Sequence, residues 1–190
     1  MSRSGATGQD VREANGSVHV CPLSAVPDTV TRTKASHLLT CLQHEILVET
    51  PRSIATGNHL RLRIHDICEP MLGCVPPGEQ HVADIIDFAS AWGGRGPMVI
   101  HCWAGISRST AAALVTLCTL NPAVPEDVIV RRLREASPTA SPNGLIIQLG
   151  DAALGRRGRL VEAVRAIGRG APATEARPFS LPADFSARQG

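Results

Sequence analysis

The chain has few aromatic residues and a single lysine, so its basic residues are almost all arginines. Its 190 residues include two Trp, three Phe and no Tyr, and Lys34 is the only lysine. Two short groups of arginines, at positions 131–134 and 156–159, have no aromatic residue between them. Sites for single-stranded nucleic acid combine basic with aromatic side chains. We therefore expect no nucleic-acid partner, and we interpret both arginine groups as solvated helix faces.

Long apolar runs are also missing. A membrane-spanning helix needs a run of about 18 or more apolar residues, and the chain contains none. The segment 1–16 is rich in Ser, Gly and Thr and has no apolar stretch. We therefore expect a flexible N-terminus, no signal peptide and no contact with a membrane.

The six cysteines show none of the spacings that build zinc fingers or redox pairs. Four of them lie in or beside apolar segments, where a reduced thiol packs as a small core residue. The seven histidines also lack the spacing of metal ligands. These features predict a cytoplasmic protein with reduced thiols, no metal and no other cofactor. Abundant Ala, Arg, Gly and Pro suit a bacterial source of high GC content.

The length allows one domain that buries its own core. We place this domain at 17–168 and expect it to be a monomer. The segment 169–190 is rich in Pro and Ala, which predicts a disordered tail. The alternative is that the tail docks its apolar residues, Phe179, Leu181 and Phe185, onto the domain or onto a partner.

Hydrophobic periodicity predicts strands early in the chain and helices late. The expected strands are 17–21, 37–42, 60–64 and 98–100, with 45–48 as a further strand or a turn. The expected helices begin at Pro27-Asp28 and then cover 78–92, 111–120, 125–136, 144–154 and 158–167. Loops are expected at 50–58 and 66–78. This order predicts an α/β sandwich, with helices around a central mixed sheet of four or five strands.

The stretch 98–109 combines a short buried strand, a small-residue turn and an Ala-rich helix. It places Cys102 and Arg108 on a loop at a helix N-terminus, where free N–H groups and the helix dipole favour an anion. Such a site also favours the thiolate, which is the nucleophilic form of cysteine. Gly105 gives the loop the backbone freedom to curl around an oxyanion, and Ser109 offers a hydroxyl to the thiolate.

The order His101-Cys102, five residues, Arg108-Ser109 resembles the signature of the cysteine-based protein tyrosine phosphatases, especially their small dual-specificity-like branch. A second segment, Ser-Pro-Asn at 141–143 with Gln-Leu at 148–149, is similar to the one that opens the helix after the catalytic helix in that branch. The resemblance implies the phosphatase-like sandwich and hydrolysis of phosphomonoesters through a phosphocysteine on Cys102.

The same resemblance assigns roles to the residues around this cysteine. It implies that Arg108 and the loop residues 103–107 bind the phosphoryl group, namely Trp103, Ala104, Gly105, Ile106 and Ser107. His101 is expected to stand behind the loop and fix it. Asn143 either braces the loop or serves only as an ordinary helix cap.

A general acid must come from a separate loop, and Asp66 is our candidate because it follows a strand and opens the loop 66–78. The Trp-Pro-Asp motif of the larger tyrosine phosphatases is absent, and Ile-His-Asp stands in its place. Glu69 therefore remains an alternative, with Asp84 and Asp87 behind it.

Two other functions stay open from the sequence: a phosphatase-like binding module without activity, and rhodanese-like sulfur transfer. For an active phosphatase, the uncharged residues at the variable loop positions predict a preference for phosphotyrosine-like monoesters over polyphosphorylated inositols. The expected partner is thus a phosphorylated protein or a small phosphomonoester.

Overall fold

The computed structural model describes residues 16–43 and 45–186. The flexible segment expected at 1–16 lies outside these residues except for Gly16. Two short 3₁₀ turns, η1 (Leu23–Ala25) and η2 (Thr56–Asn58), accompany the strands and helices described below.

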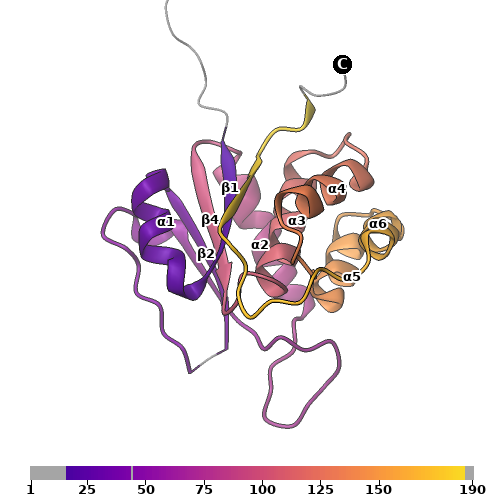
Figure 1. Cartoon of the computed structure of the whole chain (residues 1–190), viewed down its shortest axis with the longest axis horizontal. Coiled ribbons are helices and arrows are strands. Elements are labelled where there is room, and N and C mark those ends of the chain that lie inside the picture. Colours follow the sequence, from indigo (N-terminus) through magenta and orange to yellow (C-terminus); the bar gives the residue numbers. More distant parts are fainter. Residues whose placement is uncertain (1–15, 44, 187–190) are drawn as a thin grey trace, which may run out of the picture.

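A mixed five-stranded sheet forms the centre of the protein, as the sequence predicts (Figure 1). The strand order is β3-β2-β4-β1-β5, in which the first four strands are parallel and β5 runs antiparallel to β1. The carboxyl ends of the four parallel strands therefore meet at one edge, which carries the end of β4 at Cys102. The strands are β1 (Ser17–Pro22), β2 (His37–Leu42), β3 (His59–Arg63), β4 (Pro97–Cys102) and β5 (Phe179–Pro182).

Helix α1 covers one face of the sheet, and the other five helices lie on the opposite side (Figure 1). The helices are α1 (Val26–Thr33), α2 (Glu79–Trp92), α3 (Arg108–Leu120), α4 (Glu126–Ala136), α5 (Gly144–Ala153) and α6 (Arg159–Ile167). Because α4 lies between α3 and α5, the Ser-Pro-Asn segment opens the second helix after α3, not the next one. This arrangement confirms the α/β sandwich.

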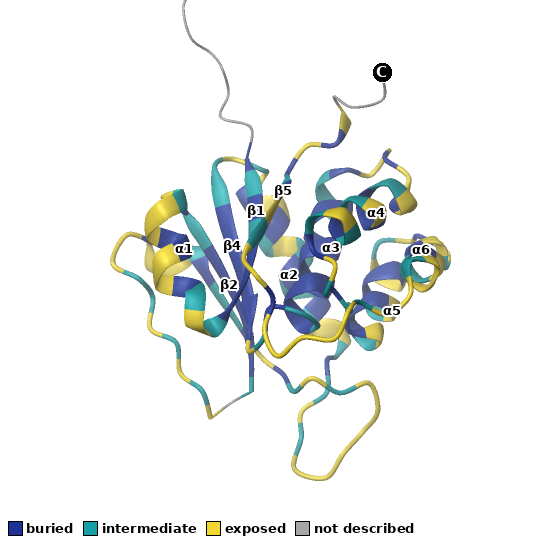
Figure 2. Cartoon of the chain, in the orientation of Figure 1, coloured by how far each residue is buried: buried dark blue, intermediate teal, exposed yellow. Residues whose placement is uncertain are grey.

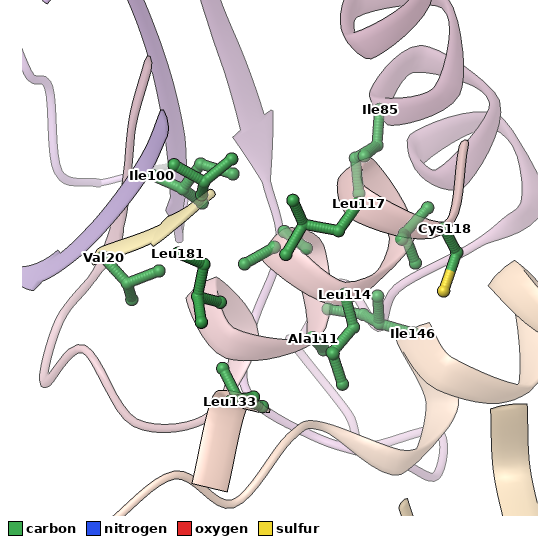
Figure 3. Close-up of a cluster of buried hydrophobic side chains, with 14 of the residues drawn as sticks. Val20, Ile85, Ile100, Ala111, Leu114, Leu117, Cys118, Leu133, Ile146 and Leu181 are labelled. Atoms are coloured by element: carbon green, nitrogen blue, oxygen red, sulfur yellow. The ribbon is translucent and has the colours of Figure 1, made fainter. Parts of the chain in front are cut away.

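Helix α3 is the core of the helical layer, and its residues from Arg108 to Cys118 are all buried (Figure 2). A glycine of α5 lets that helix approach α3 closely: a Cβ added to Gly150 would lie 2.6 Å from Val115 Cγ2 of α3. Leu114 and Leu117 belong to the same apolar cluster as Val20 and Ile100 of the sheet (Figure 3). The loop 103–107, which joins β4 to α3, is thus carried by two rigid, buried elements.

The C-terminal segment is not disordered up to residue 186, so that prediction is wrong. Strand β5 pairs with β1, with Val18 opposite Leu181. Leu181 and Phe185 are buried, and the Phe185 N–H donates to Asn121 Oδ1 at 2.9 Å. The alternative expectation, docking of the apolar tail residues on the domain, describes this segment. The edge strand β5 covers β1 and removes it from the open edge of the sheet.

The interpretation of the second arginine group as a solvated face is wrong for Arg156, which is buried. Its guanidinium donates to Glu126 Oε1 at 3.1 Å and to the Cys118 carbonyl at 2.6 Å. Glu126 also accepts two hydrogen bonds from Arg159. Although burial opposes ionisation, these arginines hold the pKa of Glu126 below its ordinary value. The network ties α3, α4 and α6 together.

The segments 45–48 and 66–78 contain no regular secondary structure. Residues 45–48 form no strand, which leaves the turn alternative. Residues 66–78 contain no helix or strand and form an exposed lobe below the domain (Figure 2). Two hydrogen bonds close the base of this lobe, from His65 N–H to the Val75 carbonyl at 2.8 Å and from Val75 N–H to His65 Nδ1 at 3.0 Å.

Candidate active site

The loop 103–107 connects the end of β4 with the start of α3, at the edge where the parallel strands end. Gly105 has a φ of 72°, and a Cβ on it would lie 2.8 Å from backbone atoms of Cys21 and Pro22. Only glycine fits this position, because any side chain would collide with the end of β1. The glycine therefore lets the loop curl tightly against the sheet.

Cys102 is buried, and its Sγ lies 3.1 Å from the Ser109 hydroxyl. This contact places a hydroxyl donor beside the sulfur, at the first turn of α3. Two neighbouring cysteines are unsuited to nucleophilic chemistry, because burial raises the pKa of Cys21 to about 12 and that of Cys41 well above its ordinary value. Their thiols are protonated core groups at neutral pH.

Arg108 brings a buried positive charge to the same loop, with its side chain only 6% exposed. Its Nη1 donates to the Ile64 carbonyl at 2.9 Å, which fixes the guanidinium against the end of β3. Its Nε has no hydrogen-bond partner among the described residues. An unsatisfied buried N–H on a cation is well suited to bind an oxyanion.

Asp66 lines a cavity of about 510 Å³ together with Cys102 and Arg108. Its Oδ1 accepts hydrogen bonds from Ser107 Oγ at 2.7 Å and from Asn143 Nδ2 at 2.9 Å. Its Oδ2 is 3.8 Å from Arg108 Nε. These contacts hold the carboxyl group of Asp66 beside Ser107 and Arg108, at the C-terminal end of the loop 103–107.

Most of the predicted binding residues line this cavity, and the alternatives for the acid do not. Gly105 and Ser109 lie behind the lining, where they shape the loop and contact the sulfur. The cavity is lined by Asp66, by Cys102, Trp103, Ala104, Ile106, Ser107 and Arg108, and by Gln43, Ala173 and Thr174. Glu69, Asp84 and Asp87 are absent from this lining.

Asn143 combines the two roles between which the sequence left a choice. Its Oδ1 accepts from the N–H groups of Leu145 and Ile146 and so caps α5. Its Nδ2 donates to Asp66, and its own N–H donates to the Ser107 carbonyl at 3.3 Å. The cap of α5 is therefore joined directly to the loop and to the candidate acid.

His101 lies behind the loop, on the opposite face of β4 from Cys102. Its Nε2 contacts Thr40 Oγ1 at 2.8 Å, and its Nδ1 lies 3.4 Å from the Cys102 carbonyl oxygen. Burial, with the nearby Arg108 charge, lowers the pKa of His101 to about 4. The imidazole is therefore neutral at pH 7.

Three residues of the site were missed by the sequence reasoning: Gln43, Ala173 and Thr174. Ala173 and Thr174 belong to the segment expected to be disordered, so composition pointed away from them. This segment is held beside the loop by a hydrogen bond from Ala176 N–H to the Ala104 carbonyl at 2.8 Å. No periodicity or motif marks Gln43, which follows β2 directly.

Among the described residues, no group of three or more His, Cys, Asp or Glu side chains is arranged to hold a metal ion. Within the same part of the chain, no helix is long and apolar enough to cross a membrane.

Comparison with known proteins finds similarity at the level of the fold. No family model matches the chain, and no curated protein matches it. The solved structure of DUSP15 is similar with a TM-score of 0.57 at 20% identity, over 83% of this chain and 93% of DUSP15. Human DUSP28 is similar with a TM-score of 0.54 at 16% identity, over 73% of this chain and 94% of that chain.

A third similar structure is the human tyrosine phosphatase-like serine/threonine/tyrosine-interacting protein. Its TM-score is 0.55 at 17% identity, over 74% of this chain and 92% of that chain. None of these similarities bears on the source of the chain, so its bacterial origin stays a prediction. The chain therefore has the α/β fold that is seen in these dual-specificity phosphatase structures.

Proposed function

We propose that the protein is a phosphomonoester hydrolase of the protein tyrosine phosphatase or dual-specificity type, acting through a phosphocysteine. One observation carries this proposal. A single cavity brings together the Cys102 sulfur, the buried Arg108 guanidinium with its free Nε–H, and the Asp66 carboxyl group. These are a nucleophile, an oxyanion-binding group and a proton donor.

In the first step, the Cys102 thiolate attacks phosphorus, and the P–O bond to the leaving group breaks. Asp66 gives its proton to the departing oxygen. Arg108 and the N–H groups at the start of α3 bind the equatorial oxygens, on which the transferred group carries its charge. The products of this step are the free alcohol or phenol and a phosphocysteine.

In the second step, water attacks the phosphocysteine and Asp66 accepts its proton. The S–P bond breaks, and the sulfur leaves as a thiolate. The Ser109 hydroxyl, 3.1 Å from Sγ, stabilises that thiolate by donating a hydrogen bond. Inorganic phosphate is released, and the cycle returns to its starting state.

For the substrate, we propose a phosphotyrosine-like monoester on a protein or a small molecule. The loop positions that line the cavity beside Arg108 are Trp103, Ala104, Ile106 and Ser107, none of which is charged. A polyphosphorylated inositol carries further phosphates that these residues leave without a cation. Trp103, 54% exposed, offers an apolar wall to a phenyl ring.

The decisive experiment compares hydrolysis of p-nitrophenyl phosphate with thiosulfate sulfurtransferase activity. We expect the first activity and not the second. Cys102→Ser should abolish turnover while the loop still binds vanadate, because the anion-binding groups remain. Steady turnover by Cys102→Ser would contradict the covalent mechanism, and sulfur transfer would favour the rhodanese-like alternative. Absence of both activities would favour a binding module.

The cytoplasmic location and the monomeric state stay predictions.

A further inference from the structure

A chain of polar side chains crosses three neighbouring strands on the face of the sheet that packs against α1. Thr40 of β2 stands at its centre, opposite His101 of β4 in the strand register. The Thr40 hydroxyl oxygen lies 2.8 Å from Nε2 of His101 and 2.8 Å from Nε2 of His59 in β3. One hydroxyl thus joins two histidines that are 42 positions apart in the sequence.

Both ends of this chain have a fixed hydrogen-bonding character. At the β3 end, His59 Nδ1 lies 3.0 Å from Thr50 Oγ1, and Arg61 Nη2 donates to the same oxygen at 2.7 Å. At the β4 end, His101 Nδ1 lies 3.4 Å from the Cys102 carbonyl oxygen. A guanidinium can only donate and a carbonyl can only accept. With both histidines neutral, the carbonyl end sets the direction of every hydrogen bond in the series.

The proton positions follow from the carbonyl end. His101 carries its proton on Nδ1 and accepts from the Thr40 hydroxyl at Nε2. The Thr40 oxygen accepts from the Nε2–H of His59, whose Nδ1 accepts from the Thr50 hydroxyl. The Thr50 oxygen accepts from Arg61. In this arrangement every hydroxyl and every imidazole donates once, which is the pattern of two neutral histidines.

The electrostatic surroundings agree with this arrangement. Burial, with the nearby Arg61 charge, lowers the pKa of His59 to about 4, and burial does the same to His101. His59, Thr40 and His101 are 8%, 3% and 0% exposed. Buried polar groups are tolerated when every member is satisfied, and none of these side-chain atoms lacks a partner.

This series of hydrogen-bonded side chains lies in otherwise apolar surroundings, because its neighbours on this face of the sheet include Leu38, Ile54 and Val99. We propose that Thr40 and His59 are positioning residues of the candidate phosphatase site. They fix the His101 tautomer whose Nδ1–H holds the Cys102 carbonyl, and so they set the start of the loop 103–107. This role rests on the proposed function, since it acts through the cysteine of that site.

The first test reads the proton positions in the wild-type protein and does not depend on activity. Long-range ¹H–¹⁵N spectra of ¹⁵N-histidine-labelled protein at pH 7.5 distinguish the two neutral tautomers. We expect the Nδ1–H tautomer for His101 and the Nε2–H tautomer for His59. The reverse pair, or a charged imidazole at either position, would overturn the proposal.

The second test compares three threonine variants in the hydrolysis of p-nitrophenyl phosphate. Thr40→Val removes the central hydroxyl with little change in shape, and displacement of the loop should lower kcat by about tenfold to a hundredfold. Thr40→Ser keeps the hydroxyl and should restore most of the activity. Thr116→Val is the matched control, because the buried Thr116 hydroxyl in α3 has no hydrogen-bond partner in the described part of the chain. It should keep the wild-type kcat.

The outcomes separate this proposal from the proposed function. An active wild type in which Thr40→Val matches Thr116→Val would overturn the positioning role alone. Failure of Thr40→Ser to restore the activity would do the same, because it would make the loss a packing effect. A wild type without phosphatase activity would overturn the proposed function and this role with it, while the tautomers would still test the hydrogen-bond direction.

Discussion

Arg108 illustrates how one residue joins the fold to the chemistry. Its Nη1 donates a hydrogen bond to the Ile64 carbonyl, and this bond anchors α3 to the end of β3. Its Nε remains free beside Asp66. Because Arg108 is the first residue of α3, its backbone position follows from the helix, and the hydrogen bond to Ile64 fixes its guanidinium beside the proposed oxyanion site.

The role of Asp66 is testable through the leaving group. A leaving group of high pKa departs slowly unless it is protonated, and such help is typically worth about 10² to 10⁴ in rate. A nitrophenolate needs much less. We therefore expect Asp66→Asn to lose far more activity on phenyl phosphate than on p-nitrophenyl phosphate, measured as kcat/KM.

Glu69→Gln is the matched control for this experiment, because Glu69 lies on the same loop but does not line the cavity. It should change either rate little. If Glu69→Gln shows the leaving-group dependence and Asp66→Asn does not, the acid is Glu69. If neither variant shows it, the acid lies elsewhere.

The buried histidines make stability depend on pH. The folded-state pKa of His101 and of His59 is about 4, below the value of about 6.5 for an unperturbed histidine. Between pH 4 and 6.5 the unfolded chain therefore binds protons that the folded chain does not, so the free energy of unfolding falls as the pH falls through this window. His101 contributes at most about 3 kcal/mol of this loss.

Urea unfolding at pH 7.5, 6.5, 5.5 and 5 measures this slope. His59→Gln removes one of the two titrating groups and should give a shallower dependence than the wild type. Burial also lowers the pKa of His19 and His37, so a residual slope of the same sign remains. Equal stability of the wild type at pH 7.5 and 5 would contradict the neutral, buried state of these histidines.

At the residue scale, the sequence predicts which site residues lie together only where those residues are close in the sequence. Cys102, Arg108 and Ser109 belong to one stretch of eight positions, so their proximity needs only a strand, a loop and a helix. Thr40 and His59 carry no motif, because they meet His101 through the pairing of β2 with its neighbours. Contacts across strands depend on register, which a single sequence does not encode in any one segment.

At the scale of elements, the segment after α6 forms one side of the cavity at the candidate site. It runs from α6 to β5 past the loop, held by hydrogen bonds from Ala171 N–H to the Pro138 carbonyl at 2.9 Å and from Gly170 N–H to Ser141 Oγ at 2.9 Å. Glu175 accepts from Ser24 Oγ at 2.9 Å. These contacts make residues 173 and 174 a fixed wall of the cavity.

This wall predicts a steric effect on substrate choice. Thr174→Phe narrows the cavity, so we expect KM for a phosphotyrosine peptide to rise by about tenfold, which corresponds to about 1.4 kcal/mol. The smaller p-nitrophenyl phosphate should be affected much less. Steady-state kinetics on both substrates measure the difference.

Arg177→Phe provides the control, because Arg177 is exposed on the same segment and does not line the cavity. It should leave both KM values near those of the wild type. An equal effect of Thr174→Phe on the two substrates would argue against a wall that selects by size.

The elements themselves were largely predictable, and the exceptions share a cause. β2 matches its predicted range, and α2 and α4 match theirs to within a residue, because their apolar periodicity is regular. β5 was missed because Pro and Ala dominate its surroundings, and its four residues gain their structure only from pairing with β1. Such a strand is specified by its neighbour and not by its own pattern.

At the scale of the whole molecule, a buried ion network joins the helical layer. Glu126 lies between Arg156 and Arg159, with N–O distances of 3.1 Å to each. Arg156 also donates to the Pro122 carbonyl at 3.0 Å. Asp151 caps α6 by accepting from the N–H groups of Gly158 and Leu160. The composition showed these arginines but not their burial, since the acidic partner lies 30 positions away in the sequence.

Removing the charge of Glu126 tests whether this network stabilises the fold. Glu126→Gln leaves the buried Arg156 without a countercharge, and breaking a buried pair in this way costs about 3 kcal/mol or more, equivalent to a Tm lower by about 10 °C. Glu162→Gln makes the same chemical change in an exposed pair with Arg165, where the loss should stay below about 1 kcal/mol. Differential scanning calorimetry of both variants provides the comparison.

Because the network lies outside the cavity, kcat of the folded Glu126→Gln protein should match the wild type. Equal Tm losses in the two variants would mean that the helical layer is held by its apolar packing around α3, with the buried ions adding no net stability.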